Sequence, residues 1–136
     1  MTLLSEPLRF LPDTEAAAGP GHVTLVGAGP GDPELLTVKA ANALRRATLV
    51  LYDNLVSKAV LELVPASADR VYVGKVSGHH SLSQTGIIEL MVRLAKGGRR
   101  LLRLKGGDPY VFGRGGEEAQ GLVAAGIPFD VIPGIS

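Results

Sequence analysis

The chain has 136 residues, which suits one compact domain, and 46 % of them are hydrophobic. Its formal charge of +1 gives no overall attraction to nucleic acid or to an anionic membrane, and its apolar runs are too short to span a bilayer. The lack of cysteine excludes disulfides, thiolate metal sites and cysteine nucleophiles, and it is compatible with the cytoplasm. We therefore expect a cytoplasmic protein without a nucleic-acid or membrane partner.

Two regions are predicted along the chain. Residues 1–21 lack the basic and apolar regions of a signal peptide, and we expect a flexible lead-in to an α/β domain over residues 22–136. Hydrophobic spacing predicts strands over 22–27, 48–53, 70–75, 100–104 and 129–132, and helices over 32–47, 58–64, 83–96 and 116–126. Strands that alternate with helices predict an open, mostly parallel five-stranded sheet flanked by helices.

Capping signals set the starts of the two longest helices. Asp32 is the expected N-cap of the first, with Pro33 at its first position, and Ser83 is the expected N-cap of the helix over 83–96. The helical spacing predicts two buried faces, formed by Leu36, Ala40, Ala43, Leu44 and Ala47 and by Ile88, Met91, Val92 and Ala95.

A first glycine cluster, GAGPGD at residues 27–32, follows the first strand. It is similar to a dinucleotide-binding turn, and Asp53 after the next strand could hold a ribose. However, Asp32 stands where the third glycine of that motif belongs, and an acid there would repel a pyrophosphate. A plain tight turn and a ligand without a diphosphate both remain open.

A second cluster, RLKGGDPYVFGRGGEE at residues 103–118, follows the fourth strand. Glycines allow backbone amides and carbonyls to line a pocket without obstruction by Cβ atoms. Ligands of open α/β sheets bind at the carboxyl ends of the strands, and both clusters are predicted to lie there.

Five collinear motifs resemble the uroporphyrinogen-III C-methyltransferases of the tetrapyrrole methylase family. They are VGAGPGDPELLT, LYDNLVS, VGK, RLKGGDPYVFGRGGEE and AGIPFDVIPGIS, between Val23 and Ser136. The resemblance implies S-adenosylmethionine-dependent methylation of uroporphyrinogen III at C-2 and C-7 to give precorrin-2, with S-adenosyl-L-homocysteine as the second product. It implies no metal, a homodimer, and a place in sirohaem or cobalamin synthesis.

The resemblance also implies roles for individual residues. Asp53 matches the proton acceptor and Lys75 the proton donor. The positions that match contacts to S-adenosylmethionine are Pro30, Gly106, Gly107, Asp108, Val111 and Ser136.

Each of these polar residues also has a simpler interpretation. Asp53 could only cap the turn after its strand, and Lys75 could be a solvated lysine or a carboxylate anchor. The basic residues Arg103, Lys105 and Arg114 could bind substrate carboxylates or be ordinary surface charges. A metal site at His79 and His80 is not expected, because no third ligand is near.

Some positions depart from the family pattern. Val76 replaces a basic residue, and Tyr110 replaces a phenylalanine. After Gln84 the family commonly has Glu and then Ile-Asn, where this chain has Gly86, Ile87 and Ile88. The family also continues past PGIS into a second α/β domain, with the cofactor between the two. The resemblance therefore implies an N-terminal domain with little activity alone and with apolar surface that favours self-association. A nicotinamide-dependent oxidoreductase domain and a non-catalytic binding module are the two alternatives.

Overall fold

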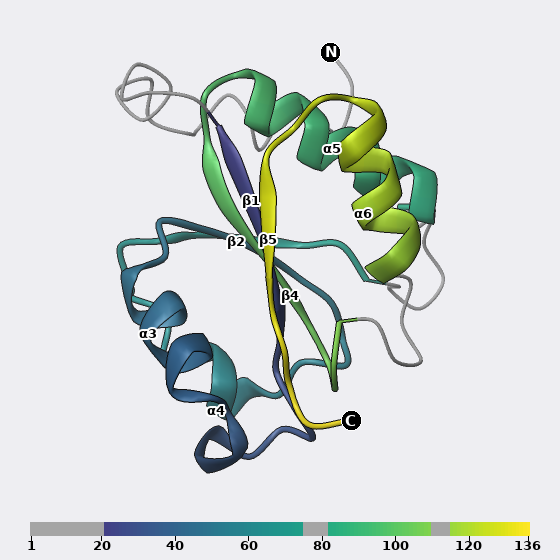
Figure 1. Ribbon diagram of the computed structural model, residues 1–136. Helices are drawn as coiled ribbons and strands as arrows, with labels where there is room; N and C mark the ends of the chain where they lie inside the picture. The colour runs from purple at the N-terminus through teal and green to yellow at the C-terminus, as the bar shows by residue number, and fades with distance from the viewer. Residues whose placement is uncertain (1–20, 75–81, 110–114) are drawn as a thin grey trace.

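A parallel sheet of five strands runs through the computed structural model, which describes residues 21–74, 82–109 and 115–136 (Figure 1). The strands are β1 (His22–Gly27), β2 (Leu49–Tyr52), β3 (Asp69–Tyr72), β4 (Arg100–Lys105) and β5 (Phe129–Ile132). Their order is β3-β2-β4-β1-β5, and every pairing is parallel. The predicted open parallel α/β sheet is confirmed. The predicted lead-in falls outside the described residues, apart from Gly21.

Helices cover both faces of the sheet (Figure 1). The helices α3 (Val38–Arg46) and α4 (Lys58–Leu61) pack on one face, and α5 (Gln84–Lys96) and α6 (Gly115–Ala124) pack on the other. A short 3₁₀ helix, η1 (Pro33–Leu35), precedes α3. No helix in the described ranges is long and apolar enough to cross a membrane.

Alternating side chains of the central strands lie in two hydrophobic cores, one on each face of the sheet. Val23 and Leu25 of β1 pack in the core under α5 and α6, whereas Val26 packs in the core under α3 and α4. Leu51 and Val50 of β2 divide between the two cores in the same way. This two-sided burial explains why these strands are continuous apolar runs.

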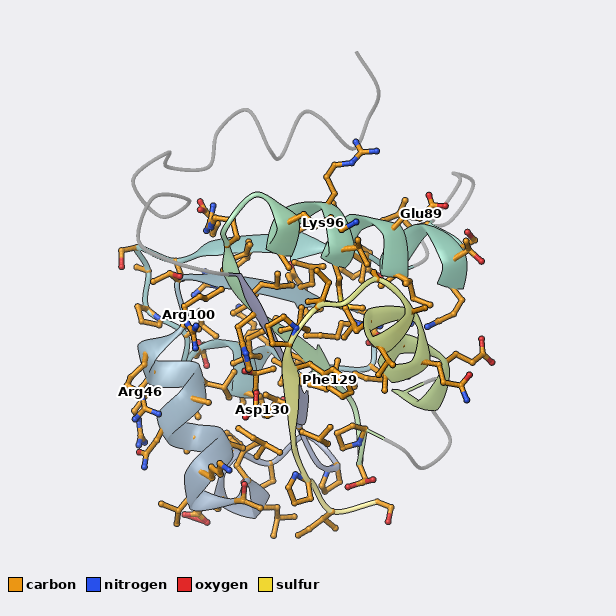
Figure 2. The ribbon with its side chains drawn as sticks, turned by 45° about the horizontal axis from the view of Figure 1, so that its top comes forward. Arg46, Glu89, Lys96, Arg100, Phe129 and Asp130 are labelled. Carbon is orange, nitrogen blue, oxygen red and sulfur yellow. The ribbon has the colours of Figure 1, made fainter. Side chains whose placement is uncertain are left out.

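The same alternation separates the side chains of β5, an edge strand. Phe129 packs on the α5–α6 side, and Asp130 lies on the other side (Figure 2). Asp130 pairs in register with Thr24, whose hydroxyl donates to its carboxylate at 2.8 Å. His22 Nε2 lies 2.7 Å from the same Asp130 oxygen.

The prediction of one helix over residues 32–47 was wrong. Asp32 caps only η1, accepting a hydrogen bond from the Glu34 amide, and Leu36 is extended with a ψ of 147°. Thr37 then caps α3 through a 3.0 Å bond from the Ala40 amide to its hydroxyl. Two capping residues lie five positions apart, so the chain begins a helix twice.

The predicted buried face of α5 was only partly right. Met91 and Ala95 are buried, but Ile88 and Val92 are only half-buried. The core positions are taken by Ile87, Leu90 and Leu94. The buried face of α5 is therefore centred about one residue earlier in the sequence than predicted.

β1 and β2 are consecutive in the chain, which favours neighbouring strands, but they are not neighbours in the sheet. The connections through α3 and α4 carry the chain outward to β3 at one edge of the sheet. The connection through α5, on the opposite face, returns the chain so that β4 enters between β2 and β1. Right-handed crossovers on opposite faces advance in opposite directions, which accounts for the return. β4 thereby occupies the centre, buried at every residue after Arg100.

Candidate active site at the carboxyl edge of the sheet

The two glycine clusters lie side by side at the carboxyl ends of β1 and β4. The Ala28 amide donates to the Lys105 carbonyl at 2.6 Å. Gly29 and Gly107 then exchange two backbone hydrogen bonds, of 3.0 and 2.8 Å, and form an antiparallel bridge. Their φ angles of 66° and 67° are left-handed, a conformation that glycine adopts without strain. The clusters therefore form one structure.

Several glycines are required by the packing of backbone against backbone. A Cβ on Gly27 would lie 2.6 Å from both the Gly107 carbonyl oxygen and the Gly134 amide nitrogen. A Cβ on Gly106 would lie 3.0 Å from the Leu55 Cβ. Gly107 differs, because the nearest atoms to its Cβ position, in Ile135 and Ser136, are 3.9 Å away. Of the 106–107 pair, only Gly107 therefore has room for a Cβ without a close contact.

The other expected cofactor positions that the structure describes lie at the same edge. Pro30 is exposed in the loop after β1, and Ser136 is exposed after β5. Asp108 is half-buried, and its Oδ1 accepts a hydrogen bond from the Gly134 amide at 3.2 Å. Asp108 thus ties the loop after β4 to the segment after β5. Val111 lies outside the described residues.

Asp53 lies just past the end of β2, and both of its carboxylate oxygens are engaged. Oδ1 accepts a hydrogen bond from the Leu55 amide at 3.0 Å, which caps the turn. Oδ2 lies 3.5 Å from Arg103 Nη2 in an ion pair, and the side chain is 18 % exposed. Asp53 therefore caps the turn after its strand and also has a charged partner. Lys75 lies outside the described residues.

A buried ionic cluster adjoins Asp53 on the α5–α6 side of the sheet. Glu118, from the first turn of α6, is fully buried. Its carboxylate accepts hydrogen bonds from Arg103 Nε at 3.3 Å, Lys105 Nζ at 3.0 Å and Gln84 Nε2 at 2.9 Å. Burial raises the pKa of Glu118, but the charges of Arg103 and Lys105 and the hydrogen bonds outweigh it and lower the pKa from its usual 4.5. The carboxylate is held ionised.

Neither of our two interpretations of Arg103 and Lys105 matches this arrangement. Their side chains are only 3 % and 7 % exposed, so they are not surface charges. Their charged groups are directed to Glu118, not left free for a substrate carboxylate. Arg114 lies outside the described residues.

The sequence analysis missed Glu118 and Gln84 as partners. One signal was present: in RLLRLK, Arg103 and Lys105 stand two residues apart and so share one face of a buried strand. Two buried cations on one face require a buried anion, and Glu117 and Glu118 begin the next helix. No sequence signal distinguishes which of the two acids turns inward. Within the described residues, no group of acidic or histidine side chains could hold a metal ion.

Comparisons with family models and with known proteins point to the same family. The family model of the tetrapyrrole (corrin/porphyrin) methylases matches residues 22–136. The siroheme synthase of Acinetobacter baylyi is 58 % identical over 122 residues, and siroheme synthase 1 of Halorhodospira halophila is 55 % identical over 133 residues. These matches cover 90 % and 97 % of this chain but only 27 % and 28 % of the relatives.

Solved structures with the same fold are also similar in sequence. The uroporphyrin III C-methyltransferase of Thermus thermophilus superposes with a TM-score of 0.75 at 52 % identity, over 85 % of this chain and 49 % of that protein. The same enzyme has been solved in complex with S-adenosylhomocysteine. A cobalt precorrin-4 methyltransferase superposes with a TM-score of 0.71 at 28 % identity, over 93 % of this chain and 49 % of that protein.

The chain therefore spans about a quarter of the length of its siroheme synthase relatives and about half of the solved methyltransferases. Within that span, the sheet, the glycine bridge and the order of the motifs all agree with one family. From Gly21 to Ser136, with the gaps noted above, nothing in the structure conflicts with that assignment. The chain belongs to the tetrapyrrole (corrin/porphyrin) methylases.

Proposed function

We propose that this chain acts in S-adenosylmethionine-dependent C-methylation of uroporphyrinogen III, at C-2 and C-7, to give precorrin-2 for sirohaem or cobalamin synthesis. The observation that carries the proposal is the 52 % identity and shared fold with the Thermus thermophilus methyltransferase. That enzyme binds S-adenosylhomocysteine, which is what remains of S-adenosylmethionine after methyl transfer.

The carboxyl edge fits a cofactor of this kind. Gly107 has no Cβ, and the nearest atoms to its Cβ position, in Ile135 and Ser136, are 3.9 Å away, so a ligand can approach the backbone closely there. We assign cofactor contacts there to Pro30, Gly107, Asp108 and Ser136. Gly106 contributes through its backbone only, because Leu55 occupies its Cβ side.

The assignment of Val111 as a cofactor contact continues to rest on the family resemblance. The same holds for Lys75 as proton donor. Both residues lie outside the described part of the chain.

Proton transfer is the chemistry we assign to the polar residues. When bound, S-adenosylmethionine supplies an electrophilic methyl group on a sulfonium sulfur. Attack of a pyrrole carbon on this methyl group breaks the sulfur–methyl bond and leaves a positive charge on the pyrrole ring. The substrate must therefore afterwards lose a proton from another position, and we propose that the Asp53 carboxylate accepts it. Asp53 remains partly accessible, and its two oxygens are oriented by Leu55 and Arg103.

The nicotinamide alternative loses its structural basis. A dinucleotide turn delivers its pyrophosphate to the N-terminus of a helix that follows directly. Here Asp32 caps the short η1, and α3 begins only at Val38. The non-catalytic binding module is favoured by no described feature.

The test is a chimera in which residues 22–136 replace the aligned segment of the Thermus thermophilus enzyme. Isothermal titration should detect S-adenosylhomocysteine and not NAD, and the chimera should methylate uroporphyrinogen III. A folded chimera that binds NAD, or one that binds neither ligand, would overturn the proposal.

Two glycine variants locate the cofactor. Gly107→Val and Gly126→Val carry the same backbone strain, since their φ angles are 67° and 73° and no atom lies within 3.8 Å of either Cβ position. Only Gly107→Val should weaken S-adenosylhomocysteine binding, on the order of 10-fold or more, because the added side chain enters the cofactor space. Equal affinities in the two variants would remove Gly107 from the site.

A homodimer and a cytoplasmic location also remain proposals. Light scattering after size-exclusion chromatography measures the first, and localisation of a tagged chain in cells measures the second. A chain that stays monomeric at high concentration would contradict the dimer.

A further inference from the structure

Arg103 connects two carboxylates that belong to different parts of the fold. Its guanidinium donates hydrogen bonds from Nε and Nη2 to the Glu118 carboxylate, at 3.3 and 3.4 Å. The same Nη2 lies 3.5 Å from Asp53 Oδ2. Nη1 donates to the Leu104 carbonyl at 3.4 Å. Every nitrogen of the side chain therefore has an acceptor, which fixes the plane of the guanidinium.

The position of Arg103 follows from the register of the sheet. Arg103 pairs with Leu51 across the β4–β2 ladder. Asp53 follows Leu51 by two residues, so Arg103 and Asp53 lie on the same face at the carboxyl end of β2. Glu118 reaches the same place from α6, above the sheet. The guanidinium lies between a fully buried anion and the edge where we place the chemistry.

Lys105 offers an internal comparison. It lies on the same strand and the same face, it is nearly as buried, and it bonds to the same Glu118 carboxylate at 3.0 Å. None of the described contacts joins Lys105 to Asp53. A point-like ammonium cannot span two carboxylates in fixed directions as a planar guanidinium does.

We propose that Arg103 is a positioning residue. Buried Glu118 holds the Arg103 guanidinium in place, and the guanidinium in turn fixes the direction of the Asp53 carboxylate. This inference rests on the proposed function, because it matters for turnover only if Asp53 takes part in methyl transfer. The Leu55 amide holds Oδ1, and Arg103 holds Oδ2, so loss of Arg103 frees the carboxylate to turn about its remaining bond.

The experiment compares Arg103→Met with Lys105→Met in the chimera described above. Each variant removes one cation from Glu118 and leaves it the other. Arg103→Met also removes the contacts to Asp53 and the Leu104 carbonyl, so it should lose more stability, and kcat is compared per folded molecule. Arg103→Met should lower kcat on the order of 10- to 100-fold, whereas Lys105→Met should change kcat by less than about threefold. The KM for S-adenosylmethionine should stay near the parental value in both.

A double-mutant cycle with Asp53→Asn separates positioning from general destabilisation. If Arg103 acts through Asp53, adding Arg103→Met to Asp53→Asn should lower kcat by no more than about twofold further. Multiplicative losses in the cycle, or equal kcat values for Arg103→Met and Lys105→Met, would refute the positioning role.

The controls distinguish this failure from failure of the proposed function. A parental chimera that folds without methyl transfer contradicts the proposed function itself. A parental chimera that is active while Asp53→Asn retains its kcat contradicts the role of Asp53, and the positioning role of Arg103 is then refuted with it.

Discussion

Replacing Glu118 by glutamine measures how strongly the buried ionic cluster stabilises the fold. Glutamine keeps the shape of the side chain but removes the charge that Arg103 and Lys105 share, at 3.3 and 3.0 Å. Removing one member of a buried ion pair costs about 3–5 kcal/mol, because the remaining charge is left unpaired away from water. Arg103 keeps Asp53 as a partner, so we expect a value near the lower end, about 3 kcal/mol.

That loss is large compared with the roughly 5–15 kcal/mol by which a typical domain is stable. Urea denaturation of the chain, followed by circular dichroism, should show it as a lower midpoint with an unchanged slope. The thermal midpoint should fall on the order of 10 °C. The control is Glu62→Gln at an exposed acid outside the cluster, which should change the free energy of unfolding by less than about 0.5 kcal/mol.

A second substitution tests the electrostatic reason. Lys105→Met should cost less stability in the Glu118→Gln background than in the parent, because its anion is already gone. If Glu118→Gln is as stable as Glu62→Gln, the reasoning about the buried cluster is refuted.

Three further predictions concern packing, pH and an unsatisfied arginine. Gly27→Ala should lose about 1–3 kcal/mol in urea denaturation because its Cβ would lie 2.6 Å from backbone atoms, whereas Gly116→Ala, with nothing within 4 Å, should gain up to about 1 kcal/mol. Loss in both variants would contradict the packing argument. The folded state lowers the pKa values of Glu118 and Asp130 below their usual 4.5 and 3.8, so their stabilisation is present above these values and is lost as pH falls through the lowered ones. When the pH is lowered below about 4.5, the urea midpoint should therefore decrease, and it should decrease less steeply in Glu118→Gln. Parallel curves of midpoint against pH for the two proteins would argue against this linkage. Arg99→Met should lower the free energy of unfolding by less than about 1 kcal/mol in thermal denaturation, or even raise it. The reason is that Nε and Nη1 of Arg99 are buried without a partner among the described residues, and its counterion Asp69 is partly solvated. A loss as large as that of Arg103→Met would show that Arg99 stabilises the fold.

The elements of this fold were predictable where one local signal acts alone. Ser83 accepts a hydrogen bond from the Gly86 amide and begins α5 as predicted. The helix over 32–47 was mispredicted because Asp32 and Thr37 both supply capping oxygens, and the spacing of apolar residues does not show which one begins the helix. The ends of β1 and β4 were predicted to within one residue because their runs meet Gly27 and Gly106.

Long-range placement was harder to predict. The periodicity of β4 shows that the strand is buried, but the order of strands depends on which face each connecting helix packs against, and this is a property of the whole sheet. The candidate site was located at the correct edge because that rule holds for any parallel sheet. The partners of Asp53 could not be predicted, since Arg103 lies 50 positions further along the chain.

The central position of β4 has a consequence for synthesis of the chain on the ribosome. Among the strands that the structure describes, β1 pairs with β4 and β5, and β2 meets β1 through β4. The glycine loop after β1 likewise has no bridge partner until Gly107 has been made. During synthesis only the β2–β3 ladder can form early, and the apolar β1 must wait for β4 to emerge. We expect β1 to be the segment most exposed to chaperones and to aggregation during translation.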